Sequence, residues 1–188
     1  VQTEGVYWKI AFGIRAGTGA AIDYQKVQRE VEATALATGQ ATDELGRVMA
    51  GVFQETGDAQ FARATIETIA TAATGAHEPL ELMGNIAGTL NEKFGVAEEG
   101  IGSALAAAVS LGNKGGISVA DLGEKLGVMG AFAKEAGLQG EDGFAKTLAL
   151  MNLADDATGN LKKGLGAVGG LLETLSSKSE RVKIGAKL

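Results

Sequence analysis

Apolar residues recur along most of this chain with the spacing of an amphipathic α-helix, and glycines separate one recurrence from the next. The clearest case begins after Thr42, a candidate capping residue, and ends at Gly57. Its apolar positions follow the i, i+3, i+4, i+7, i+8 pattern of one helical face: Leu45, Val48, Met49, Val52 and Phe53. This segment is therefore predicted to be a helix with one buried face.

The same pattern predicts further helices on both sides of this one. A weakly periodic helix is expected over residues 19–38. Asp58 caps the next helix, which stops at Gly75, and Pro79 opens another, which stops at Gly95. Later helices are expected at 101–112, at 119–137 with Ser118 as its cap, around 144–151, and at 161–175. No stretch alternates with period 2, so the predicted fold class is all-α, a series of short amphipathic helices with Gly-rich breaks.

The last of these helices has a heptad-like apolar stripe with 4-3-4-3 spacing. Such a stripe is typical of a helix that packs along another helix, in the same chain or in a second copy. The predicted helix-packing or oligomer contacts are Leu161, Leu165, Val168, Leu172 and Leu175.

Charge divides the chain into three regions. Residues 1–40 carry four basic and four acidic side chains and are predicted to form an apolar N-terminal segment, with an extended arrangement as an alternative, followed by a helix. Residues 41–175, the predicted helical core, carry nine basic and eighteen acidic side chains, a net charge of −9. Residues 176–188 form a basic tail with a net charge of +3. The acidic core argues against specific nucleic-acid binding, which requires clustered Lys and Arg.

Three segments superficially resemble ligand sites. Residues 164–169 match GxGxxG, but they lie inside a helical pattern rather than on a strand-to-helix turn, so close helix packing is favoured. Residues 112–116 lack the order of a phosphate-binding loop and are interpreted as a turn. His77, the single histidine, lies between helices and is expected to have a surface or capping role.

The carboxylate pairs are also interpreted structurally. Residues 98–99, 141–142 and 155–156 are each expected near a helix N-terminus, where carboxylates stabilise the helix dipole. The chain has no cysteine, which excludes disulfides and thiolate metal sites. The sequence therefore predicts no enzyme, with no catalytic, cofactor-binding or metal site; a small wall-degrading enzyme is the least favoured alternative.

Glycine pairs four residues apart leave a second alternative open. Such pairs, at residues 13/17, 84/88, 123/127 and 166/170, allow close helix contact in water or in a bilayer. The longest apolar run, about a dozen residues, is shorter than the ~18 that a transmembrane helix needs. A membrane-active, pore-forming helical protein unrelated to tails is thus the alternative prediction.

Residues 115–126, 133–138 and 144–151 together resemble the core region of phage tail tape measure proteins. That family carries a Gly-initiated "xxVxxLxxxL" helix, an "AxxAGL" helix end and an "LxxALAxLxxAG" helix in this order. The resemblance extends upstream through residues 68–75 and 39–45 and downstream to Leu175, about 135 residues. Gene transfer agents use the same protein.

This resemblance implies a structural virion protein in the tail tube lumen and at the tail tip. It implies roles in tail length determination, tail assembly, and DNA ejection or passage through the host envelope. Expected partners are further copies of the chain, as a trimer or hexamer inside the tail, and the tail tube, distal tail and hub or baseplate proteins. Contact with the host membrane at ejection is also implied, and no cofactor is.

The chain departs from the family in length. Tape measures are usually much longer, and 188 residues of continuous helix would span only ~280 Å at ~1.5 Å per residue. The chain is therefore expected to be a domain of a longer protein or to belong to a particle with an unusually short tail.

Overall fold

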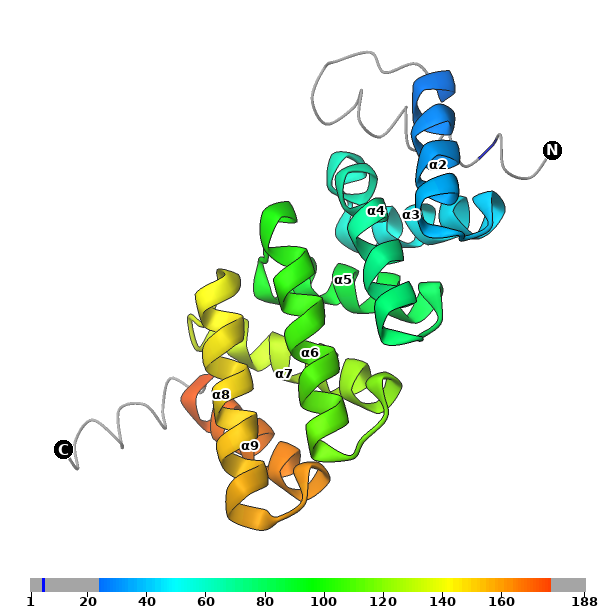
Figure 1. The fold of residues 1–188 in the computed structure, drawn as a ribbon. Coiled ribbons are helices and arrows are strands. Elements are labelled where there is room, and N and C mark those ends of the chain that lie inside the picture. Colours follow the sequence, from blue (N-terminus) through cyan, green and yellow to red (C-terminus); the bar gives the residue numbers. More distant parts are fainter. Residues whose placement is uncertain (1–4, 6–23, 177–188) are drawn as a thin grey trace. The chain divides into compact units, whose positions relative to one another are not determined.

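The computed structural model describes residue 5 and residues 24–176, and all regular structure in this part is helical. The α-helices are α2 (Tyr24–Thr38), α3 (Thr42–Thr56), α4 (Ala59–Ala76), α5 (Leu80–Phe94), α6 (Ile101–Gly115), α7 (Val119–Glu135), α8 (Gly140–Thr158) and α9 (Leu161–Ser176), with a 3-10 turn, η1, at Glu98–Gly100 (Figure 1). The prediction of an all-α fold is confirmed.

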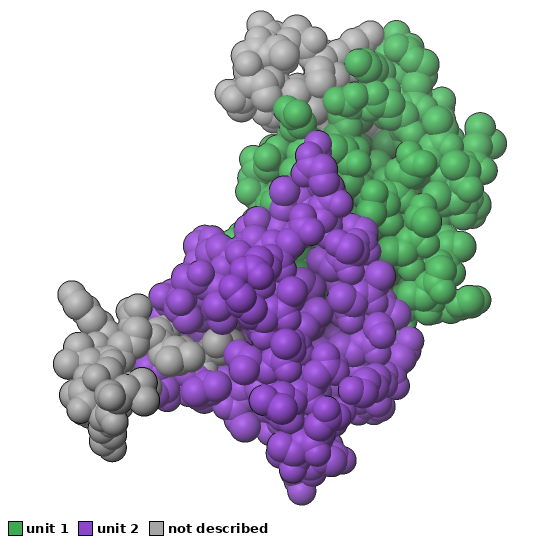
Figure 2. All heavy atoms as spheres, turned by 60° about the vertical axis from the view of Figure 1, so that its left-hand side comes forward, with its two compact units in different colours: residues 1–92 green, residues 93–188 purple. Residues whose placement is uncertain are grey.

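The chain divides into two compact units, residues 1–92 and residues 93–188 (Figure 2). In the first unit α2 packs on α3 and α4, and α3 packs on α4. In the second unit α6 packs on α7 and α8, and α9 packs on both α7 and α8. The boundary expected at residue 40 thus lies inside the first unit, between helices that pack on each other.

Helix α5 approaches α3 closely in the first unit because two glycines face it. A Cβ added to Gly84 would lie 2.5 Å from Cγ1 of Val48, closer than non-bonded carbon atoms come. Gly88 faces Glu55 in the same way, and the Thr89 hydroxyl donates a hydrogen bond to Oε1 of Glu55 at 3.1 Å. The pair Gly84/Gly88 therefore serves a contact between helices of one chain.

Within residues 24–176, each connection between successive helices contains a residue with left-handed backbone. Alternate connections divide this part of the chain into helical hairpins, and their left-handed residues, called turn residues below, are Gly39, His77, Gly116 and Gly159, with φ of 72°, 57°, 64° and 61°. The hairpins are α2–α3, α4–α5, α6–α7 and α8–α9. The chain is therefore an internal repeat of helical hairpins, an organisation that the sequence analysis did not find.

Counting from the turn residue places equivalent core positions in register. Eight residues before it lie Val31, Ile69, Ala108 and Met151, each at most 1 % exposed. Six residues after it lie Leu45, Met83, Leu122 and Leu165, each at most 4 % exposed. Each hairpin thus buries the same face of both helices, as tandem helical repeats do.

The predicted helix ends were right where the stop or cap has a direct physical cause. Gly57 and Gly95 follow helices with φ of 69°, a left-handed conformation that glycine adopts without a Cβ clash. The Asp58 carboxylate accepts hydrogen bonds from two backbone N–H groups of α4, and the Ser118 hydroxyl accepts one from the backbone N–H of Asp121.

Four local predictions were wrong. Residues 112–115, interpreted as part of a turn, are the last helical residues of α6, and only Gly116 of that segment has left-handed backbone. Thr42 is the first residue of α3, and Ala41 is the N-cap, with no side-chain capping bond. Helix α4 continues past Gly75 to Ala76 and ends at His77, because the histidine takes the left-handed conformation. Asp155 and Asp156 lie in the last turn of α8, because that helix runs to Thr158 and the next begins only at Leu161.

Candidate functional site

The first helices of neighbouring hairpins border a groove in each unit. In the first unit the groove lies between α2 and α4 and has a volume of about 440 Å³. Its walls are small and apolar side chains with charged groups among them: Glu30, Ala33, Thr34, Ala37, Arg63, Ala64, Ile66 and Glu67. The repeat geometry places it here, because α2 and α4 run side by side as equivalent helices.

An ion pair between Glu30 and Arg63 joins the two walls of this groove. The guanidinium donates from Nη2 to Oε1 of the carboxylate at 2.5 Å and from Nε to Oε2. This bidentate hydrogen bonding lowers the pKa of Glu30 and raises that of Arg63, and burial opposes both shifts. Since Glu30 is held ionised against a cation, it connects α2 to α4 and is not poised for acid–base chemistry.

The equivalent groove of the second unit lies between α6 and α8 and is more apolar. It has a volume of about 370 Å³ and is lined by Ser103, Ala104, Ala107, Glu141, Asp142, Phe144, Ala145 and Leu148. The Asp142 carboxylate at its rim accepts a hydrogen bond from Nζ of Lys146 at 2.5 Å. Small side chains on α6 thus leave an open surface beside α8.

The predicted contact residues of α9 fall partly in the core of the second unit. Leu161, Leu165 and Val168 are 1 %, 4 % and 4 % exposed in a helix that packs on α7 and α8. The side chains of Leu172 and Leu175 lie outside the described part of the chain. The three described residues thus form helix contacts within one chain, and an oligomer contact through this stripe stays a prediction.

The GxGxxG segment at residues 164–169 lies in the middle of α9, with no strand before it in the described residues. A Cβ added to Gly164 would lie 2.8 Å from the carbonyl carbon of Ala154 in α8. Added Cβ atoms on Gly166 and Gly169 would meet nothing within 4 Å. Gly164 therefore allows close packing of α9 on α8, and the other two glycines have no such role.

The remaining candidates lie on different helices and turns, and within the second unit the Glu141 side chain lies against Gly100, the residue after Glu99. His77 is exposed at its turn, and residues 112–115 belong to the last turn of α6, before the left-handed Gly116. Glu98 and Glu99 open η1, Glu141 and Asp142 open α8, and Lys114 pairs with Asp156 at 3.7 Å.

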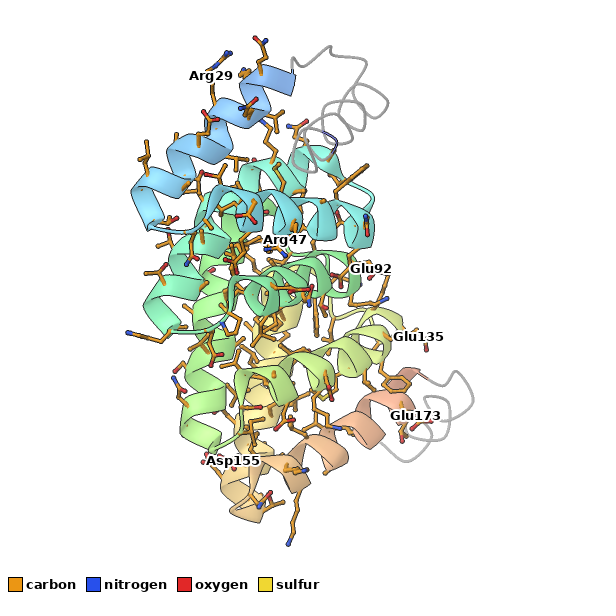
Figure 3. All side chains as sticks on the ribbon, turned by 90° about the vertical axis from the view of Figure 1, so that its right-hand side faces the viewer. Arg29, Arg47, Glu92, Glu135, Asp155 and Glu173 are labelled. Atoms are coloured by element: carbon orange, nitrogen blue, oxygen red, sulfur yellow. The ribbon has the colours of Figure 1, made fainter. Side chains whose placement is uncertain are left out.

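Charged side chains of each unit are spread over several helices. Figure 3 shows Arg29 on α2 and Arg47 on α3 in the first unit, and Glu135 on α7, Asp155 on α8 and Glu173 on α9 in the second. In the described part of the chain, no three His, Cys, Asp or Glu side chains gather so that they could hold a metal ion. Within residues 24–176, no helix combines the length and apolarity that a bilayer crossing requires.

Comparison of the chain with protein-family models, curated proteins and solved structures found no match.

Sequence reasoning missed the two grooves and the Glu30–Arg63 pair because both depend on the repeat. The signal was present in the sequence: alignment on the turn residues places Leu45, Met83, Leu122 and Leu165 in one column. Since one of the four turn residues is a histidine, a search for glycine alone would have lost one hairpin.

Proposed function

We propose that this chain is a structural protein of a phage-like tail, a tape measure protein or its core region. It would act in tail length determination, tail assembly and passage of DNA through the host envelope. The observation that carries the proposal is the ordered series of glycine-stopped helices between residues 42 and 175, which resembles the tape measure core.

Two of the segments with this resemblance coincide with helix ends in the second unit, and the third, residues 144–151, lies within α8. Residues 115–126 include the turn residue Gly116 and the start of α7. Residues 133–138 form the end of α7, where backbone N–H groups of Leu138 and Gly137 donate to Ala133 and Lys134 at 2.8 and 3.1 Å. This is the paired-bond arrangement of a glycine-terminated helix. These two segments are thus patterns of helix ends, which suits a structural role.

The charge of the core also supports the proposal. Residues 41–175 carry a net charge of −9, so they repel the phosphate backbone of DNA. A protein that occupies a tail lumen and leaves ahead of DNA benefits from weak adhesion to it. The proposed partners are further copies of the chain, as a trimer or hexamer, together with tail tube, distal tail and hub or baseplate proteins. The proposed location is the tube lumen and the tail tip.

An in-frame deletion of residues 41–175 in the producing locus tests this proposal. Electron microscopy of the particles is expected to show shortened or missing tails, with loss of infectivity or gene transfer. A matched control carries the exposed substitution Glu67→Gln and is expected to keep normal tails. Tails of unchanged length with normal infectivity in the deletion strain would contradict the proposal.

A further inference from the structure

The boundary between the two compact units lies inside helix α5. This helix runs without a break from Leu80 to Phe94, and the first unit ends at Glu92. Residues 80–92 therefore belong to the first unit, and the last two helical residues, Lys93 and Phe94, belong to the second. Each of the other α-helices in the described part of the chain lies entirely within one unit.

The larger part of α5 is held in the first unit. The side chains of Val48 and Glu55 on α3 occupy the places where Gly84 and Gly88 would otherwise carry a Cβ. Three apolar residues of this part are at most 2 % exposed, namely Met83, Ile86 and Leu90. Close contact on one side and full burial of these side chains fix residues 80–92 on the rest of the first unit.

The C-terminal end of α5 is held in the second unit. The Phe94 side chain is fully buried, and its ring meets the ring of Phe144 on α8 edge to face, with 5.2 Å between centroids. On α7, a Cβ added to Gly130 would lie 2.6 Å from Cβ of Lys93 and 2.8 Å from Cε2 of Phe94. Helices α7 and α8 thus both contact the last two residues of α5.

The second unit also supplies a polar contact at this end. The last four carbonyl groups of a helix have no partner within the helix. The carbonyl of Lys93, one of these four, accepts a hydrogen bond of 3.5 Å from Nε2 of Gln139, in the connection between α7 and α8. The helix then stops at Gly95, which has a left-handed backbone.

These contacts make the last turn of α5 depend on both units. If the second unit unfolds, Phe94 is exposed to water and the Lys93 carbonyl loses its partner, so the final turn frays back toward the buried Leu90. If the first unit unfolds, Lys93 and Phe94 lose the helix that precedes them. Two residues cannot nucleate a helix, because formation of the first turn is unfavourable.

We propose that α5 couples the two units, so that each unit is more stable while the other is folded and both unfold in one transition. Neighbouring repeats of helical arrays stabilise one another through the interfaces between them. Here the coupling passes along one continuous helix. By linkage, a partner that binds either folded unit would stabilise both. The inference does not depend on a role in a tail.

Hydrogen exchange of the full chain, measured by mass spectrometry, tests the coupling when the second unit alone carries a destabilising substitution. Gly164→Ala is suitable, because the atoms nearest to the added Cβ belong to Ala154 of α8 and not to α5. The slowest amides exchange through unfolding of their cooperative unit. Gly164→Ala should speed their exchange in α7, α8 and α9 by about tenfold, and in α3 and α4 by the same factor.

Two glycines inserted between Glu92 and Lys93 interrupt α5 at the boundary between the units. In this background Gly164→Ala should speed exchange in the second unit only. The matched control carries two glycines between Gly39 and Gln40, in the connection between α2 and α3, and leaves α5 continuous. In the control the effect of Gly164→Ala should reach both units, and circular dichroism should show native helix content for both insertions.

Faster exchange in the second unit alone, in the chain without an insertion, would overturn the inference. So would an effect that still reaches the first unit after the insertion at residue 92, because the coupling would then not pass through α5. Gly130→Ala gives a test that needs no insertion, since the added Cβ displaces the end of α5 directly. Exchange of residues 83–90 should then rise together with that of α7, and unchanged exchange of residues 83–90 would also overturn the inference.

Discussion

His77 adopts a left-handed backbone conformation, with φ 57° and ψ 36°, where the three equivalent turn residues are glycines. That conformation destabilises the folded state by roughly 1–2 kcal/mol for a residue with a Cβ. Glycine avoids this strain, but it makes the unfolded chain more flexible, which lowers stability by about 0.4–1 kcal/mol. His77→Gly is therefore expected to raise the free energy of unfolding by about 0.5–1 kcal/mol, measured by urea denaturation.

The reciprocal substitution is the control. Gly116 has φ 64°, and an added Cβ would meet nothing within 4 Å, so Gly116→Ala changes backbone strain without a new clash. It should lower the free energy of unfolding by about 0.5–1 kcal/mol. If His77→Gly destabilises the protein, the histidine has contacts at this turn that outweigh its backbone strain.

The Glu30–Arg63 pair gives the first unit a dependence on pH. Glu30→Gln leaves a half-buried guanidinium without its anion and is expected to lower the free energy of unfolding by about 1 kcal/mol at pH 7, a value reduced for solvent exposure. Folding lowers the pKa of Glu30, so the ionised carboxylate stabilises the folded state. This contribution to the free energy of unfolding is fully present above the pKa of the unfolded chain, about 4.3. The contribution is lost as pH falls through the lower folded pKa.

Urea denaturation of the wild type and of Glu30→Gln at pH 7 and at pH 3 checks this. The difference in free energy of unfolding between the two proteins should be smaller at pH 3 than at pH 7. Glu32→Gln, two residues along the same helix at an exposed position, should change stability by less than ~0.5 kcal/mol at both pH values. A difference that stays constant with pH would show that the carboxylate charge is not what stabilises the α2–α4 contact.

At the scale of the helix, the sequence predicted each element through the period of its apolar residues and the glycines that follow. Gly57, Gly95 and Gly137 have positive φ and end helices, and the periodicity located the buried face of α3. The end of α4 could not be found this way because a histidine adopts the left-handed conformation there. The prediction that Asp155 and Asp156 lie near a helix N-terminus was wrong. It depended on the rule that acidic residues favour helix N-termini, and these two residues lie in the last turn of α8.

Helix α9 offers a comparison between two glycines that the sequence alone does not distinguish. Gly164 lies against the backbone of Ala154, so Gly164→Ala must push α9 away from α8 and is expected to lower the free energy of unfolding by about 1–3 kcal/mol. Gly166, two residues later, faces open space. Gly166→Ala should therefore raise the free energy of unfolding by about 0.5–1 kcal/mol, because alanine has the higher helix propensity.

Urea denaturation of both variants measures the two changes in free energy of unfolding, which are expected to have opposite signs. Equal effects would show that close packing of α8 and α9 does not depend on Gly164. The contrast also separates the two interpretations of the GxGxxG segment, because a phosphate-binding turn would require all of its glycines, whereas helix packing requires one.

At the scale of the whole chain, the repeat explains why so few aromatic residues are needed for the core. Each hairpin buries a similar set of small and medium apolar side chains, so few aromatic residues are needed, and Phe94 and Phe144 supply one edge-to-face contact in the second unit at 5.2 Å between ring centroids. Sequence periodicity can show that such faces exist but not which helices they join. The two grooves follow only from the register of the hairpins.

Net charge sets the expected behaviour of the chain toward DNA. The core carries −9, and four of the cations, Lys178, Arg181, Lys183 and Lys187, lie in the tail. Fluorescence anisotropy with duplex DNA at ~0.15 M salt is expected to give binding weaker than a Kd of ~10⁻⁴ M, the weak end of non-specific affinity. Any residual binding should require the basic tail, because counterion release needs cations next to phosphate.

A chain that ends at residue 176 separates the contributions of tail and core. It should show no binding even at ~0.05 M salt, where non-specific contacts are strongest. Circular dichroism of this chain should match the full protein over α2 to α9, so that loss of binding reports charge and not unfolding. Tight binding by the shortened chain would place a cationic surface on the helical core, and the proposed passage of DNA past a non-adhesive protein would then be wrong.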